Sequence, residues 1–265
     1  MTSPKSTQAS ALPTLDLLGM PVAHVDENAL LDHMFSALGE GRGGWVVTAN
    51  LDHLHRYARQ SELRALYADA DVIVADGMPL VWASRVLGSP LPERVAGSAL
   101  IYRFAERAAR EQRSIYFLGG EPGAAEACAA VLVQRAPGLR VAGCSAPRVQ
   151  SPPSDAEVAA IREEVARAQP DLLLVAFGSP KQEQLIARLR GDLPRTWMVG
   201  VGISFSFVAG QVARAPAWMR ASGLEWVHRL SQEPGRLARR YLLDDLPFAF
   251  ELFARSAAQR VRGKP

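Results

Sequence analysis

The sequence has few cysteines and no long apolar run. Only Cys128 and Cys144 occur in 265 residues; the two could pair, but so sparse a pair is more typical of reduced thiols. No run of 18 or more apolar residues is present, so the sequence predicts no transmembrane helix. The start, MTSPKSTQASALPTLDLLG, lacks the apolar core of a signal peptide. We therefore expect a cytoplasmic protein in which residues 1–13 form a loose N-terminal tail.

Several motifs of catalysis and cofactor binding are also missing. No GxSxG occurs, and the histidines lack the spacing of metal ligands. GVGISF, residues 200–205, lacks the third glycine of a dinucleotide fingerprint. Asp69 and Asp71 resemble the Asp-x-Asp that holds a metal-bound sugar nucleotide, but they precede a strand instead of following one, which favours a helix end. The sequence therefore predicts no cofactor and no protein metal ligands, and leaves a divalent metal open.

Short apolar runs alternate with Ala-, Leu- and Arg-rich helical stretches from about residue 44 to residue 205. This alternation predicts an α/β domain over residues 14–213, with a Rossmann-like, mainly parallel sheet and helices on both faces. The predicted strands are residues 44–47, 72–75, 114–118, 140–143, 172–177 and 196–201.

Polar and glycine residues gather directly after these strands. Because the carboxyl ends of parallel strands meet at one edge of a sheet, and this edge forms the ligand crevice of open α/β folds, we expect a binding site there. The candidate residues are Thr48, Asn50, Asp76, Gly77, Gly119, Gly178, Lys181, Gln182 and Gly202.

Three of the candidate positions have alternative structural roles. Asp76, between a buried strand and a helix, can act as a general base or bind a hydroxyl, or can cap the helix. Arg94, in a loop, suits a phosphate or diphosphate because it stays charged and binds bidentately, although a solvated arginine is the commoner case. Lys181 and Gln182 open a helix, where backbone N–H groups attract anions, or where they are part of an ordinary helix start.

The basic charge is concentrated in residues 214–265. This stretch has ten Lys/Arg and five Asp/Glu, a net of +5, and the whole chain carries +3, so residues 1–213 net −2. A basic, aromatic helical segment binds anionic lipid headgroups or nucleic acid. The apolar patch LPFAFELF, residues 246–253, favours a membrane surface and argues against nucleic acid. The alternative is a basic helix packed on its own domain or on a dimer partner.

The arginines of this stretch show a helical spacing. Arg229, Arg236 and Arg239 are separated by seven and three residues, which places them on one face of a continuous helix. Arg240 broadens that face. Pro234 can instead begin a new helix as a first-turn residue, which would break the register.

Five motifs together resemble the WecG/TagA/CpsF glycosyltransferases, family 26, over about residues 15–245. The motifs are TANLDHL (48–54), DGMPLVW (76–82), RVAGS (94–98), FGSPKQE (177–183) and GQVARAPAWMRASGLEWVHRLSQEPGRLARRY (210–241). The resemblance implies a Rossmann-like fold with a C-terminal helical appendage, residues 214–265, that docks on the membrane. It also implies an inverting transfer from a nucleotide diphosphate sugar, such as a UDP-sugar, to an undecaprenyl-diphosphate-linked sugar at the inner face of the bacterial membrane. A homo-oligomer is compatible with it.

Residue roles follow from the same resemblance. Asp76 is implied as the general base and Arg94 as the stabiliser of the departing diphosphate. Thr48, Asn50 and Gln182 are implied as sugar contacts. The arginines implied to meet the lipid diphosphate or the headgroups are Arg214, Arg229, Arg236, Arg239 and Arg240.

Two positions depart from the family pattern. RVAGS is followed by Ala99 where the family usually has Asp, and Ser206 also replaces a usual Asp. Either change could alter the donor sugar, which the sequence leaves open among N-acetylmannosamine, its uronic acid and glucose, together with the linkage position. The same changes motivate a second hypothesis, a non-catalytic scaffold in a polysaccharide complex. A nicotinamide oxidoreductase is a third, weakened by the broken glycine fingerprint.

Overall fold

The computed structural model describes residues 12–263, without the side chains of Ala217, Ala221 and Arg236. Its centre is a sheet of six strands in the order β4-β3-β8-β7-β5-β6, and every neighbouring pair is parallel. The predicted parallel α/β fold is confirmed, and the strands end within two residues of the predicted limits. The strands are β3 (Gly44–Ala49), β4 (Val72–Ala75), β5 (Ser114–Gly119), β6 (Arg140–Ser145), β7 (Leu172–Ala176) and β8 (Trp197–Gly200).

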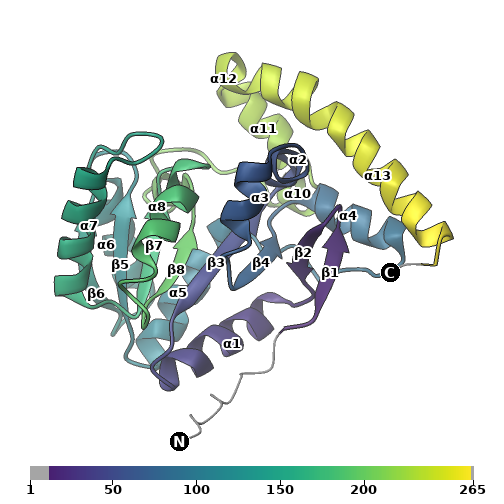
Figure 1. The fold of residues 1–265 in the computed structure, drawn as a ribbon. Helices are drawn as coiled ribbons and strands as arrows, with labels where there is room; N and C mark the ends of the chain where they lie inside the picture. The colour runs from purple at the N-terminus through teal and green to yellow at the C-terminus, as the bar shows by residue number, and fades with distance from the viewer. Residues whose placement is uncertain (1–11, 264–265) are drawn as a thin grey trace, which may run out of the picture.

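Helices cover both faces of this sheet, as the sequence predicts (Figure 1). Alternate residues of each strand enter different cores: Val46 and Val74 pack on one face, and Val47 and Ile73 pack on the other. The first face carries α1 (Glu27–Gly39), α5 (Gly97–Arg110), α6 (Ala124–Arg135) and α9 (Ser204–Val208). The second carries α2 (Leu51–Arg59), α3 (Ser61–Tyr67), α4 (Met78–Leu87), α7 (Asp155–Ala168) and α8 (Lys181–Leu189).

A small antiparallel ribbon precedes this domain and was not predicted. It consists of β1 (Thr14–Leu17) and β2 (Met20–Ala23), and its apolar side chains join the core of the second face. Its turn places Leu18 at φ 55° and Gly19 at φ 90°, so a leucine occupies a position where Asn or Asp is the usual signal. Asp16 supports the turn, because its Oδ1 accepts the Gly19 N–H at 2.9 Å. Residues 1–11 of the predicted tail lie outside the described residues.

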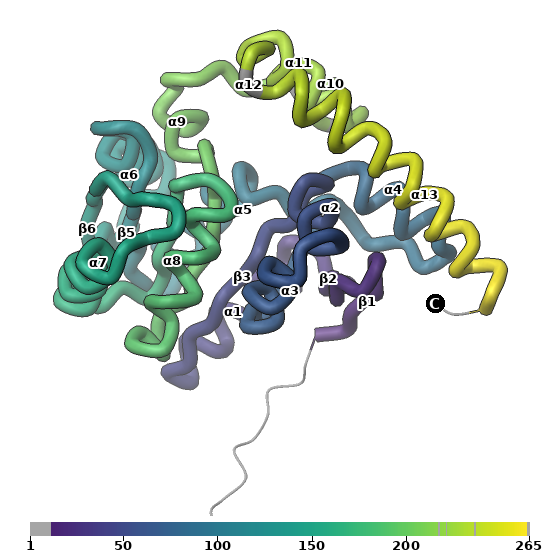
Figure 2. Tube along the Cα trace, turned by 45° about the horizontal axis from the view of Figure 1, so that its top comes forward, coloured from purple at the N-terminus to yellow at the C-terminus, as the bar shows by residue number. Residues whose placement is uncertain are grey.

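The C-terminal segment, residues 214–263, is helical throughout most of its length. It contains α10 (Ala217–Ala221), α11 (Glu225–Gln232), α12 (Pro234–Arg239), the π-helix η1 (Arg240–Asp245) and α13 (Leu246–Val261). Glu233 has φ −131° and ψ 57°, so α11 ends there and Pro234 opens the next helix. Arg229 and Arg239 therefore do not lie on one continuous helix, and Pro234 begins a new helix, which is the alternative that the sequence left open. In Figures 1 and 2, α10–α12 lie past the carboxyl edge of the sheet, and α13 runs along α4.

The helix α13 is packed on the core along one side only. Phe248 and Leu252 are 2% and 0% exposed and belong to the core of the second face. Phe250 is 69% exposed. One side of the predicted apolar patch, residues 246–253, therefore packs in the core, and the other side faces solvent. Within residues 12–263, no helix combines the length and the apolar character needed to cross a membrane.

A close approach at Gly223 also holds the C-terminal segment to α4. Gly223 has φ +73°, a conformation that other residues rarely adopt. A Cβ at this position would lie 2.8 Å from the Trp82 ring and 2.9 Å from Cβ of Met78. The glycine therefore allows the segment to lie directly against the start of α4, at the edge of the sheet where the candidate residues are.

Replacing Leu252 with alanine tests whether α13 is part of the folded core. Because the Leu252 side chain is fully buried, we expect Leu252→Ala to lower the free energy of unfolding by about 3 kcal/mol, measured by denaturant unfolding. Leu243→Ala is the matched control, since Leu243 is 68% exposed, and it should leave the stability almost unchanged. Equal effects of the two substitutions would contradict the packing.

Candidate functional site at the carboxyl edge of the sheet

A cavity of about 1290 Å³ opens at the carboxyl edge of the sheet. Its walls come from the loops after β3, β4, β5, β7 and β8 and from the C-terminal segment, which supplies Glu225, Trp226 and Tyr241. This volume exceeds the common range for a single small-molecule site, so the cavity can hold two ligands at once. Most of the candidate residues line it: Thr48, Asn50, Asp76, Gly77, Arg94, Gly178, Lys181, Gln182, Gly202, Arg229 and Arg240.

The remaining candidates lie elsewhere. Gly119 ends β5 without lining the cavity, and Gly120 lines it instead. Arg214 donates to Oγ of the cavity residue Ser98 at 2.8 Å, and burial lowers the pKa of its guanidinium. Arg239 is exposed on α12. The side chain of Arg236 lies outside the described residues.

The backbone N–H that binds Asp76 comes from α5 and not from α4, the helix that follows Asp76 in the sequence. The residue follows β4 directly, and Gly77 occupies the N-cap of α4 without a side-chain cap bond. The Asp76 carboxylate instead accepts the N–H of Gly97, at the start of α5, with Oδ2 at 3.0 Å. A Cβ at Gly97 would lie 3.6 Å from Oδ2 and 3.3 Å from Thr48 Oγ1, so a glycine leaves room for this approach. The capping alternative for Asp76 therefore does not apply to α4.

The carboxyl of Asp76 has an unusual proton affinity. Burial raises its pKa to about 7, against the opposing effects of the Gly97 N–H and the Arg94 charge. Glu225 raises the pKa further, because its negative charge disfavours a second carboxylate nearby. A carboxylate whose pKa is close to neutral pH can accept a proton and release it, which is the property that a general base requires.

Arg94 reaches across the cavity to the C-terminal segment. Its Nη1 donates to Oε2 of Glu225, at the start of α11, at 2.9 Å, and both side chains are mostly buried. Both residues line the cavity. The ion pair thus joins the loop between α4 and α5 to α11, at the place where an anionic ligand group would meet Arg94.

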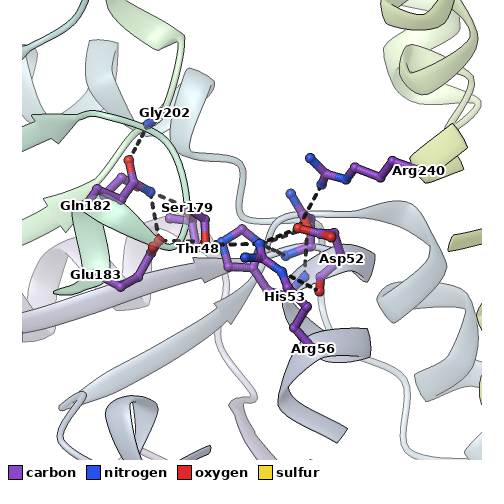
Figure 3. Close-up of polar contacts among 11 residues, drawn as sticks. Thr48, Asp52, His53, Arg56, Ser179, Gln182, Glu183, Gly202 and Arg240 are labelled. Carbon is purple, nitrogen blue, oxygen red and sulfur yellow. Dashed lines mark hydrogen bonds and ion pairs between the residues drawn. The ribbon is translucent and has the colours of Figure 1, made fainter. Parts of the chain in front are cut away.

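Polar groups at the end of β3 and in the segments after β3 and β7 form a buried network (Figure 3). Thr48 Oγ1 donates to the Gly200 carbonyl at 3.1 Å. Asn50 caps α2, because its Oδ1 accepts the His53 N–H at 3.2 Å. Gln182 Oε1 accepts the Gly202 N–H at 3.1 Å, and its Nε2 donates to Glu183 at 2.8 Å. The bonds of Thr48 and Gln182 fix these side chains relative to the end of β8 and the turn after it, and the bond of Asn50 fixes its side chain relative to α2.

Lys181 and Arg240 are also held by protein partners. The Lys181 ammonium donates to the Val149 carbonyl at 2.8 Å. Arg240, in η1, lies 3.0 Å from Asp52 on α2 and 3.5 Å from Asp245. Burial raises the pKa of Asp245 to about 6. The Arg240–Asp52 ion pair links the C-terminal segment to the core at the rim of the cavity.

Sequence reasoning missed three residues of the site: His53, Glu183 and Glu225. Glu183 follows Gln182 in the same motif, but nothing local indicates that it meets His53, 130 positions earlier. The two come together because β3 and β7 both adjoin β8, and the helices after them share one face.

Of the two departures from the family pattern, Ser206 is buried in the cavity wall and Ala99 is not part of it. Among the described residues, no three acidic, His or Cys side chains are grouped to hold a metal ion.

Comparison with known proteins decides the family. Residues 15–262 match the model of the glycosyl transferase WecG/TagA/CpsF family. The chain belongs to this family, and it is therefore a glycosyltransferase. It is 32% identical over 206 residues, 76% of either chain, to an N-acetylglucosaminyldiphosphoundecaprenol N-acetyl-beta-D-mannosaminyltransferase of Bacillus spizizenii. A protein of the same name from Bacillus subtilis is 26% identical over 229 residues, 86% of this chain and 87% of its own.

The raised pKa of Asp76 makes a testable contribution to stability. A carboxyl whose folded pKa is raised stabilises the fold fully below its unfolded pKa, near 3.8, and this contribution is lost as the pH rises through about 7. Asp76→Asn has no such titration. We therefore expect the variant to gain stability relative to the original chain as the pH rises from 4 to 7, and the difference to level off above that, in thermal unfolding at a series of pH values. A difference that does not change with pH would contradict the raised pKa.

Proposed function

We propose that this glycosyltransferase moves a sugar from a nucleoside diphosphate sugar, such as a UDP-sugar, to an undecaprenyl-diphosphate-linked sugar, with inversion at the anomeric carbon. The observation that carries the proposal is the Asp76 carboxyl, with a pKa of about 7, in the same cavity as the Arg94 guanidinium. The names of the two Bacillus relatives support N-acetylglucosaminyl-diphosphoundecaprenol as the acceptor.

In this mechanism Asp76 accepts the proton of the acceptor hydroxyl. The hydroxyl oxygen attacks the anomeric carbon of the donor, and the bond from that carbon to the diphosphate oxygen breaks on the opposite side, which inverts the configuration. The departing nucleoside diphosphate gains negative charge, and Arg94 stabilises it in place of its bond to Glu225. The cavity volume of about 1290 Å³ supports the simultaneous presence of both sugars.

The donor sugar is proposed to depend on the wall that contains Ser206. This side chain is 5% exposed in the cavity lining, and a serine there offers a neutral hydroxyl where the family pattern usually places a carboxylate. A change of charge in a buried wall strongly alters which ligand groups are tolerated. N-acetylmannosamine, named in both relatives, is the first donor sugar to test.

Replacing the proposed base tests the mechanism. Asp76→Asn keeps an oxygen for the Gly97 N–H but cannot take a proton, so we expect turnover to fall by about a hundredfold while the donor still binds. The measurement is nucleoside diphosphate release in the presence of a lipid-linked acceptor. Asp69→Asn is the control, because Asp69 lies beyond the end of α3 and outside the cavity lining. Unchanged turnover in Asp76→Asn would remove Asp76 from this role.

We also propose that the C-terminal segment docks on an anionic membrane surface. Leu243 in η1 and Leu246 and Phe250 in α13 are exposed, and the spacing of four residues places Leu246 and Phe250 on one side of α13. Exposed arginines, among them Arg239 and Arg255, accompany them. Apolar side chains that enter the lipid boundary together with cations that meet anionic headgroups are the features of an interfacial helix.

Vesicle binding tests this docking. We expect Leu243→Ser combined with Phe250→Ser to weaken binding to anionic vesicles about tenfold or more, because both apolar contacts with lipid are lost. The control is Val131→Ser with Val133→Ser, which removes two exposed apolar side chains of α6. Sedimentation with vesicles measures both. Equal binding of the two double variants would assign the exposed residues of the C-terminal segment a different role.

A further inference from the structure

His53 and Glu183 form a buried pair between two helices of the second face. His53 lies in the first turn of α2 and Glu183 in the first turn of α8, and they are 6% and 2% exposed. His53 Nε2 is 3.5 Å from Glu183 Oε1. Figure 3 shows Glu183 beside Gln182, with a dashed line that joins Glu183 to His53. The mechanism proposed above uses neither residue.

The hydrogen bonds around His53 determine where its protons lie. Asn50 Oδ1 accepts the His53 backbone N–H, so the amide oxygen must be the atom on that side. The same oxygen is 2.7 Å from His53 Nδ1. Two acceptors cannot make so short a contact, so Nδ1 carries a proton and donates it. The Asn50 N–H is also 3.4 Å from Nδ1, a longer and weaker contact than the one to Oδ1.

The opposite nitrogen of the ring then faces a carboxylate. A neutral imidazole with a proton on Nδ1 has only a lone pair on Nε2, which would face Glu183 Oε1 at 3.5 Å. A proton held between Nε2 and Oε1 removes this conflict. Burial alone would raise the pKa of Glu183, but hydrogen bonds from His53, Gln182 and Ser179 and the His53 charge keep it below its usual value.

The pair also determines which groups Asn50 and Gln182 offer to the cavity. The Asn50 oxygen is occupied by His53, and the Gln182 oxygen is occupied by the Gly202 N–H. Gln182 donates one hydrogen of its amide to Glu183. Both residues line the cavity, and the hydrogens that their amides retain are donors. A Cβ at Gly200 would lie 2.5 Å from Gln182 Nε2, so the glycine leaves room for this amide at the end of β8.

We propose that the His53–Glu183 pair positions the side-chain amides of Asn50 and Gln182. This wall of the cavity then presents N–H donors to an oxygen of a substrate sugar, such as a hydroxyl or acetamido carbonyl oxygen. The inference rests on the proposed transferase function for the nature of the ligand. The pair itself is a property of the folded chain and can be tested without turnover. His53 and Glu183 act through their neighbours and do not contact the reacting atoms.

The first experiment observes the two ring nitrogens of His53 by nitrogen-15 NMR. We expect Nδ1 of the original chain to carry a proton, as its 2.7 Å contact with Asn50 Oδ1 requires. In Glu183→Gln, which preserves the shape and removes the charge, we expect the Nε2 resonance to shift, because the new amide can donate to a bare Nε2 and the carboxylate cannot. An Nδ1 without a proton in the original chain, or an unchanged ring in Glu183→Gln, would overturn the pair. Glu164→Gln is the matched control: Glu164 accepts from Tyr116 and Ser145 away from the cavity.

The second experiment separates positioning from a purely structural role. We expect Glu183→Gln to raise the KM of a sugar substrate about tenfold with little change in kcat, as for an interaction made equally in the ground and transition states. Asn50→Asp provides an independent variant, since its carboxylate still accepts from His53 but offers no N–H to the cavity, and it should raise the same KM. Normal KM values in both variants would overturn the donor wall. Absence of turnover in the original chain would instead count against the proposed function and leave the NMR result intact.

Discussion

The site depends on one constraint, the common direction of all six strands of the main sheet. Parallel strands bring their carboxyl ends to the same edge, and the loops after β3, β4, β7 and β8 therefore converge there although they are far apart in the sequence. The connecting helices supply their N-termini at the same edge, and these termini hold Asn50 and receive the Asp76 carboxylate. The C-terminal segment completes the cavity from above this edge and is held there by contacts with α2 and α4.

Several charged side chains in and behind the cavity wall lie in pairs, and Asp76 does not. Arg94 is bonded to Glu225, Arg240 to Asp52, and His53 lies against Glu183. Pairing is expected because an isolated charge is costly away from water. Asp76 receives a neutral N–H from Gly97, and among the side chains that the structure describes no cationic nitrogen forms an ion pair with it. This difference explains why burial raises the pKa of Asp76 to about 7 while that of Glu183 is lowered.

The sequence predicted the parts of the fold that depend on local pattern. Buried parallel strands are short, nearly continuous apolar runs, so 72–75 was located without error and the other strands to within two residues. The polar residues after the strands followed from the same pattern, and most of them line the cavity. The ribbon β1–β2 escaped prediction because Leu18 adopts a turn conformation for which leucine gives no signal.

Contacts between distant segments could not be predicted in the same way. The pairing of His53 with Glu183 and that of Arg94 with Glu225 depend on strand order and on where the C-terminal segment packs. The division of residues 246–253 into a buried and an exposed side depends on the contact of α13 with α4, because Phe248 and Phe250 have the same chemistry in the sequence. Such assignments require the tertiary structure, since composition and spacing are identical under either arrangement.

We propose that the protein transfers one sugar to a lipid-linked acceptor bound in this cavity. The most direct measurement incubates the purified protein with a short-chain polyprenyl-diphosphate N-acetylglucosamine and a panel of nucleoside diphosphate sugars, and determines the mass of the lipid product. We expect one donor to add the mass of a single sugar residue and to release an equal amount of nucleoside diphosphate. An unchanged lipid mass across the panel, with the protein folded and the acceptor bound, would contradict it.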